Sequence, residues 1–190
     1  MKKISKGQLW EYFILVSRYW LAFILIFYSI AKLTGFQFYM DSNLLETKVK
    51  DANLFKLSWF LADHEPFKTF IVVSQISAAL FLIFKRTAVI GAFLVIPIWL
   101  NILIWDVSFM DRIMAIQFGF RISYYIILTG LILWFYRDKI IIAYKSLTEK
   151  INSGLNRSVL LYISLPIIGF ALEYIIGKIV SVILTIIYRL

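Results

Sequence analysis

Long apolar stretches alternate with short polar ones along this chain. Four or five of the apolar stretches are long enough to cross a bilayer, whose core requires about 20 residues of helix. The expected spans cover residues 9–33, 67–84, 87–109, 113–136 and 159–187. The pattern therefore predicts an all-α fold in which a polytopic bundle of antiparallel helices crosses the membrane.

The lengths of the connections predict how the spans are grouped. Lys85 and Arg86 mark a tight turn between the second and third spans, and only the polar stretch 106–112 joins the third to the fourth. Short connections place consecutive helices side by side and antiparallel. We therefore expect residues 1–136 to form a four-helix core, and residues 159–190 to add a fifth, C-terminal span on or beside it.

Two segments outside the spans have a pattern of their own. Residues 44–61 mix apolar and charged positions in the way that is typical of a helix lying on a membrane surface. We expect this interfacial helix on the outer face. Residues 137–158 are basic and partly amphipathic, and we interpret them as a cytoplasmic loop.

Composition supports the membrane interpretation. Hydrophobic residues make up 62% of the chain and aromatic residues 18%, whereas a soluble domain has roughly 45–50% apolar residues. The formal charge of +9 suggests either nucleic acid or membrane contact. Because the basic residues lie in loops beside apolar spans, we expect the lipid bilayer as partner and no nucleic acid.

The placement of Lys and Arg predicts the orientation. If the N-terminus is cytoplasmic, ten basic residues lie in inner segments and six in outer ones. Cytoplasmic loops carry the excess of basic residues in membrane proteins. The sequence therefore predicts a cytoplasmic N-terminus.

The residue inventory excludes several kinds of chemistry. The chain has no cysteine and a single histidine, His64. Disulfides, iron–sulfur ligation, paired haem ligands and a His-rich metal site are therefore excluded. The sequence also lacks a Gly-rich phosphate loop. We expect no catalytic residues and no metal-ligating residues, and we interpret the chain as non-catalytic.

Charged and amide side chains inside the spans are the candidates for a site. A charge within the hydrocarbon costs on the order of 2.5–3.5 kcal/mol, so it persists mainly when it is paired or faces a watery cavity. The candidate ligand-binding residues are Lys32, Gln75, Asn101, Asp106, Arg121 and Glu173. In the predicted orientation they gather toward the outer half of the membrane. We hypothesise an outward-facing polar pocket with Arg121 as its central cation and Asp106 or Glu173 as the counter-ion.

Each of these residues also has a structural interpretation. Lys32 can extend its ammonium to the outer head groups, and Asp106 can end its span in contact with water. The small residues of the fifth span are typical of helix packing. A structural ion pair involving Arg121 or Glu173 is as consistent with the sequence as a ligand site.

The first span also predicts which side chains share a face. Arg18, Leu25, Ser29 and Lys32 follow one another at helical intervals, and Arg18 and Lys32 are about four whole turns apart. Both basic residues should therefore lie on the same side of this helix.

Several motifs resemble those of DoxX-like membrane proteins. They are Arg18-Tyr19-Trp20-Leu21 and the run Ser29-Ile30-Ala31-Lys32-Leu33-Thr34-Gly35-Phe36 in the first span, then residues 57–61, 70–80 and 82–92 and the pair Asn101-Ile102. The resemblance covers about residues 10–136. It implies a four-helix bundle of the bacterial inner membrane, in a family named after a small subunit of a quinone-linked oxidoreductase.

The resemblance also implies a function. We expect a non-catalytic accessory subunit of a larger inner-membrane complex, with other membrane proteins as partners and a link to quinone or redox chemistry. Quinone or lipid is the cofactor class that the residues allow. Gln75 stands where relatives often have Glu, which puts a proton-linked role there in doubt. Two alternatives stay open: a binding or transport module for a lipophilic or anionic ligand, and a membrane immunity or assembly factor acting through helix–helix contacts.

Overall fold

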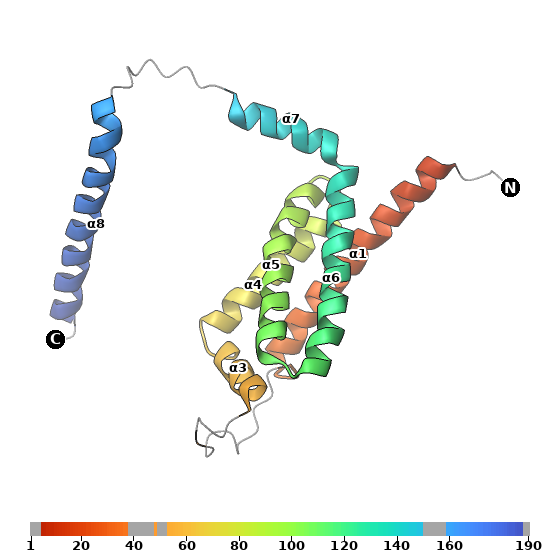
Figure 1. The fold of residues 1–190 in the computed structure, drawn as a ribbon, viewed down its shortest axis with the longest axis horizontal. Helices are drawn as coiled ribbons and strands as arrows, with labels where there is room; N and C mark the ends of the chain where they lie inside the picture. Colours follow the sequence, from red (N-terminus) through yellow and green to blue (C-terminus); the bar gives the residue numbers. More distant parts are fainter. Residues whose placement is uncertain (1–4, 38–47, 49–52, 150–158, 188–190) are drawn as a thin grey trace. The chain divides into compact units, whose positions relative to one another are not determined.

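A computed structural model of the protein describes residues 5–37, 48, 53–149 and 159–187, and all regular structure in these ranges is helical. The helices are α1 (Lys6–Leu33), α3 (Leu54–Ala62), α4 (Phe67–Ile83), α5 (Ala88–Phe109), α6 (Arg112–Phe135), α7 (Arg137–Thr148) and α8 (Val159–Ile187) (Figure 1). The predicted all-α class is confirmed.

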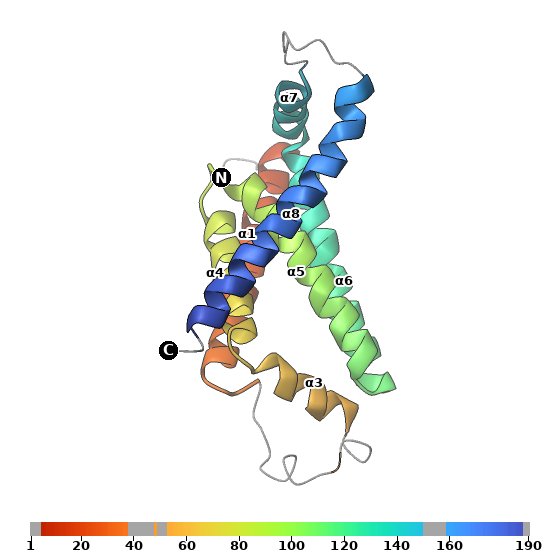
Figure 2. The ribbon, with the colours of Figure 1, turned by 90° about the vertical axis from the view of Figure 1, so that its left-hand side faces the viewer.

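Four of these helices form the bundle. α1 packs on α4, α4 on α5, α5 on α6, and α6 returns to α1, so the four close into a ring. Consecutive members run in opposite directions, as Figure 2 shows. The short connections at residues 84–87 and 110–111 make α4, α5 and α6 antiparallel neighbours.

The outer surface of the bundle has the character of a lipid-facing one. Phe23, Phe70, Ile104 and Ile127 are each more than half exposed, and a soluble protein rarely exposes large apolar patches of this kind. Within the described residues, four helices are long and apolar enough to span a membrane, or up to five if α3 and α4, which meet at 77°, form one bent span. The expected second span is thus the shortest, with 17 residues in α4.

Small residues bring α4 and α5 together. Ala78 and Ala79 on α4 and Ala92 on α5 are fully buried. At Gly91, an added Cβ atom would lie 2.6 Å from the backbone nitrogen of Leu82. The two backbones therefore touch at the α4–α5 turn, and only glycine fits there.

Side-chain caps explain why some helices begin earlier than expected. α1 begins at Lys6 because Ser5 and Gln8 form a capping box, in which each side chain bonds the other's backbone N–H. α6 begins at Arg112 because the carboxylate of Asp111 accepts hydrogen bonds from the backbone N–H groups of residues 113 and 114.

Two segments outside the bundle differ from the predictions. The segment interpreted as a basic loop forms a helix, α7, over Arg137–Thr148, because apolar positions recur there at helical intervals between the basic ones. The rest of that segment, 150–158, lies outside the described residues. Of the expected interfacial helix at 44–61, α3 covers the part from Leu54, and most of the remainder lies outside the described residues.

α8 covers the expected fifth span from Val159 to Ile187. It belongs to a unit separate from the bundle. The packing of the fifth span on the bundle therefore stays a prediction.

Candidate functional site

A small cavity lies at the end of the bundle where α3 is placed. Its volume is about 60 Å³. Its walls come from the end of α1, from α3, and from α4 and α5. The lining residues are Tyr28, Lys32, Gln37, Trp59, Ala62, Phe67, Ile71, Asn101, Ile102, Trp105 and Asp106. We call it the Lys32–Asp106 cavity; it contains three of the six predicted site residues.

Lys32 and Asp106 bring opposite charges into this cavity. Only 4% of Lys32 and 7% of Asp106 are exposed, and the two charges interact electrostatically. The ammonium of Lys32 also donates to Oε1 of Gln37 at 2.9 Å and lies 5.4 Å from the centre of the Tyr28 ring. Lys32 is thus held inside the protein by contacts with protein groups, and its reach to the outer head groups stays a prediction.

Aromatic side chains form the apolar part of the cavity. Trp59 comes from α3, Phe67 from α4 and Trp105 from α5, and the ring centres of Phe67 and Trp105 are 6.3 Å apart. Ala62, which is 3% exposed, packs beside them on α3. The cavity therefore combines a charged pair with aromatic faces, an arrangement suited to an amphiphilic molecule.

A second polar layer lies directly beneath the cavity. Tyr28 lines the cavity and also packs its ring edge-on against Trp99, with the ring centres 6.4 Å apart. Gln75 is fully buried, and its Oε1 lies 3.4 Å from the hydroxyl of Ser29, which also donates to the carbonyl of Leu25.

Two donors in this layer have no acceptor. Nε2 of Gln75 and Nε1 of Trp99 are buried and find no hydrogen-bond partner within the part of the chain that the structure describes. An unmet buried donor costs about 1–3 kcal/mol. The layer beneath the cavity is therefore suited to a group that supplies hydrogen-bond acceptors, such as water or the polar end of a ligand.

Of the six predicted residues, four occupy this region. Lys32 and Asp106 form its charged pair, Asn101 lies on its exposed side, and Gln75 lies in the layer beneath. The sequence identified these four residues by their expected depth in the membrane. The shared face of α1 that the spacing predicts is confirmed, because Arg18, Leu25, Ser29 and Lys32 are all buried.

Arg121 does not line the cavity. It lies exposed on α6, with its guanidinium 5.0 Å from the centre of the Phe118 ring. The position of central cation, which the sequence analysis gave to Arg121, is held by Lys32, because the last turn of α1 and not the middle of α6 faces Asp106. Glu173 lies exposed on α8, in the separate unit, and its pairing stays a prediction.

A buried arginine, Arg18, lies at the opposite end of the bundle from the Lys32–Asp106 cavity. Arg18 is 3% exposed. Its guanidinium donates to the carbonyl of Leu82 at 2.9 and 2.8 Å, to the carbonyl of Ile83 at 2.9 Å and to the hydroxyl of Tyr136 at 3.2 Å. The last carbonyls of a helix lack intrahelical partners and carry partial negative charge. Arg18 therefore caps α4 and joins three helices.

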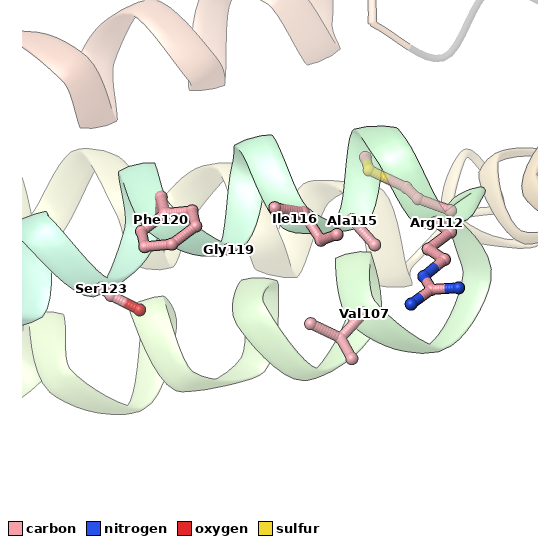
Figure 3. A pocket seen from close by; sticks show the side chains of 8 residues that line it. Val107, Arg112, Ala115, Ile116, Gly119, Phe120 and Ser123 are labelled. Atoms are coloured by element: carbon pink, nitrogen blue, oxygen red, sulfur yellow. The ribbon is translucent and has the colours of Figure 1, made fainter.

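An open groove runs between α5 and α6 on the outside of the bundle. Figure 3 shows it, with Arg112 near one end and Phe120 and Ser123 toward the other. Its volume is about 660 Å³, and apart from Arg112 its walls are mostly apolar. Among the residues that line the groove, Arg112 is the only charged one.

In the described part of the chain, no three His, Cys, Asp or Glu side chains lie close enough to hold a metal ion.

No family model, no curated protein and no solved structure matches the chain. The resemblance to DoxX-like proteins therefore stays a prediction.

Proposed function

We propose that this protein is a membrane-embedded binding protein for a small amphiphilic molecule, whose polar group enters the Lys32–Asp106 cavity. The observation that carries the proposal is the enclosure of two opposite charges among aromatic rings inside an apolar bundle. Buried charges in a membrane are costly, and they mark functional sites more often than not.

The charges of the site indicate the kind of ligand. Lys32 and Asp106 sum to zero, so a ligand with a large net charge of either sign gains little. The aromatic walls favour a lipophilic body. A neutral or zwitterionic head group with oxygen acceptors fits both features, and quinones and lipids belong to this class.

The size of the cavity limits what it holds. An apolar cavity of about 150 Å³ holds one benzene molecule, so a cavity of about 60 Å³ accommodates a small polar group and not a whole lipophilic molecule. The rest of the ligand would lie in the bilayer beside the bundle. The unmatched donors of Gln75 and Trp99 would then meet acceptors on the ligand.

The membrane setting forms part of the proposal. We place the protein in a bacterial inner membrane with its N-terminus cytoplasmic, as the charge distribution favours. In that orientation the cavity opens near the outer head groups, because it lies at the end of α1.

A second candidate function is that of an accessory subunit in a membrane complex. The observation that favours it is Glu173, an acidic residue in α8, where the described side chains from 163 to 187 are exposed, except for a half-buried Ser164. A carboxylate in an apolar span is less costly against a protein partner than against lipid. Co-purification of stoichiometric partner chains that are lost in Glu173→Leu would support this function.

The binding proposal is tested by extraction of what the protein carries. The full chain is purified in a mild detergent, and the bound small molecules are extracted and quantified by mass spectrometry. We expect one lipophilic compound at close to one per chain in the wild-type protein. Ala62→Phe fills the cavity without changing a charge, so it should reduce the bound compound at least about tenfold.

The matched control adds the same side chain elsewhere. Ala143 is exposed on α7, away from the cavity, so Ala143→Phe should carry as much of the compound as the wild type. The proposal fails if the wild-type protein yields only bulk lipid, or if both variants carry the compound equally well.

A further inference from the structure

The turn between α4 and α5 presents two neighbouring cations at the end of an apolar groove. Leu80, Phe81 and Phe84 form the apolar wall of this groove, Lys85 and Arg86 lie at its end, and its volume is about 600 Å³. Both basic residues are exposed. This division into an apolar length and a charged end matches that of a phospholipid.

The backbone of the turn is held in place by two contacts, so the two basic residues project from a fixed position. The hydroxyl of Thr87 donates to the carbonyl of Phe81 at 3.0 Å, which closes the end of α4. The backbone contact at Gly91 leaves no room for the turn to move toward α5. A site with a fixed position loses less entropy when a ligand binds.

More positive charge lies next to this turn. Arg18 bonds both the carbonyl of Ile83, just before the turn, and the hydroxyl of Tyr136, where α7 begins. The start of α7 follows Tyr136 directly, and there Arg137, which is paired with Asp138 at 3.8 Å, and Lys139 leave one net positive charge. Lys139 lies over the ring of Tyr136, with its ammonium 5.6 Å from the ring centre.

α7 itself has the form of a helix at a membrane surface. It leaves the end of α6 crosswise to the bundle (Figures 1 and 2). None of its residues is buried, and Ile141, Tyr144 and Leu147 are at least 48% exposed. Apolar side chains beside basic ones on such a helix are typical of contact with the boundary between head groups and acyl chains.

We propose that the α4–α5 turn is a binding site for an anionic phospholipid. The phosphate lies against Lys85 and Arg86, an acyl chain follows the groove along α4, and the basic start of α7 adds attraction. Basic residues near a membrane surface attract anionic lipid, and each further one adds to that attraction. The groove beside Arg112 has one basic residue in its lining, whereas the groove at the α4–α5 turn has two.

The test compares two lipids that differ only in charge. The full chain in detergent is titrated with dioleoylphosphatidylglycerol or dioleoylphosphatidylcholine, and bound lipids are counted by native mass spectrometry. We expect the wild type to bind the anionic lipid roughly tenfold or more tightly than the zwitterionic one. Lys85→Gln with Arg86→Gln should remove that preference. Equal binding of the two lipids by the wild-type protein overturns the proposal.

Two further variants separate this site from general charge effects. Arg112→Gln removes a cation from the mouth of the other groove, so it should leave the preference unchanged; a loss as large as that of the double variant overturns the proposal. Phe84→Gln changes the groove wall and no charge. It should weaken binding of the anionic lipid severalfold, and undiminished binding shows that no acyl chain lies in the groove.

Discussion

Arg18 and Leu82 are 64 residues apart in sequence, yet two nitrogens of the Arg18 guanidinium, Nε and Nη2, donate to the one carbonyl oxygen of Leu82. That carbonyl belongs to the last turn of α4, where no intrahelical donor is present. The arginine thereby satisfies groups that a membrane interior leaves without water.

Replacing Arg18 should therefore destabilise the bundle. Because Arg18→Met removes the donors and leaves the carbonyls of Leu82 and Ile83 exposed to an apolar surrounding, we expect the free energy of unfolding to fall by about 2–4 kcal/mol. Tyr136→Phe removes a single hydrogen bond and should cost about 1 kcal/mol. Reversible unfolding in mixed detergent and SDS measures both. An Arg18→Met protein as stable as the wild type would contradict the role of a cap.

The contact between α4 and α5 gives a second prediction. In Gly91→Ala the new methyl group would meet the backbone of Leu82, so the helices must separate and the free energy of unfolding should fall by about 1–3 kcal/mol. Gly130→Ala is the matched control, since nothing lies within 4 Å of an added Cβ there. Alanine favours the helix over glycine, so this variant should be as stable as the wild type or more stable. The same unfolding assay compares them, and equal losses in both variants would contradict the close contact.

The charged pair of the cavity predicts a non-additive effect. Lys32→Met leaves the carboxylate of Asp106 buried without its cation, which should cost about 3–5 kcal/mol. The double variant Lys32→Met with Asp106→Leu should recover most of that loss, because no uncompensated charge remains. A double-mutant cycle on unfolding free energies measures the coupling.

A more exposed pair at the same end serves as the control for that cycle. Lys68 and Asp63 form an ion pair of 2.8 Å with side chains that are 20% and 31% exposed. Removal of Lys68 should change stability by less than about 1 kcal/mol. If the Lys32–Asp106 coupling is no larger than that of this pair, the two charges of the cavity are screened by solvent and the cavity is not an enclosed site.

The fold followed closely from the apolar pattern, because the bilayer requires long helices and the short connections require antiparallel neighbours. α1 begins three residues and α6 one residue before the expected position, since the side chains of Ser5 and Asp111 set these starts and not hydropathy. The segment that forms α7 was interpreted as a loop although its pattern is partly amphipathic, because its many basic residues are also typical of a cytoplasmic loop.

The sequence predicted how deep the site residues lie along their helices, but not toward which neighbour each side chain faces. Lys32 and Asp106 were identified because charges inside spans are unusual. Arg121 was chosen as the central cation for its depth alone, whereas the rotation of α6 about its axis turns it to the outside. That rotation depends on how all four helices pack, and it is not encoded in the spacing of one helix. The cap formed by Arg18 could not be predicted from the sequence either, because its acceptors are backbone carbonyls of another helix.

The unmet donor of Gln75 allows stability and binding to be separated. Gln75→Leu keeps the side-chain volume roughly constant and removes an amide whose Nε2 has no acceptor among the described residues. Replacing an unsatisfied buried polar group by an apolar one of similar shape is neutral or stabilising. We expect an unchanged or higher unfolding free energy and a reduced amount of the extracted lipophilic compound. A clear loss of stability would instead show that Gln75 is fully satisfied in the native protein.

The orientation in the membrane decides which leaflet each proposed site faces. Because the chain contains no cysteine, single Lys→Cys variants report on one position each. Lys85 in the α4–α5 turn and Lys145 on α7 lie at one end, and Lys48 lies beyond the other end of α1. With spheroplasts and a membrane-impermeant maleimide, Lys48→Cys should be labelled at once, and Lys85→Cys and Lys145→Cys only after lysis. Labelling of Lys85→Cys in intact spheroplasts would reverse the assignment: the Lys32–Asp106 cavity would then open toward the cytoplasm, and the lipid site at the α4–α5 turn would draw on the outer leaflet.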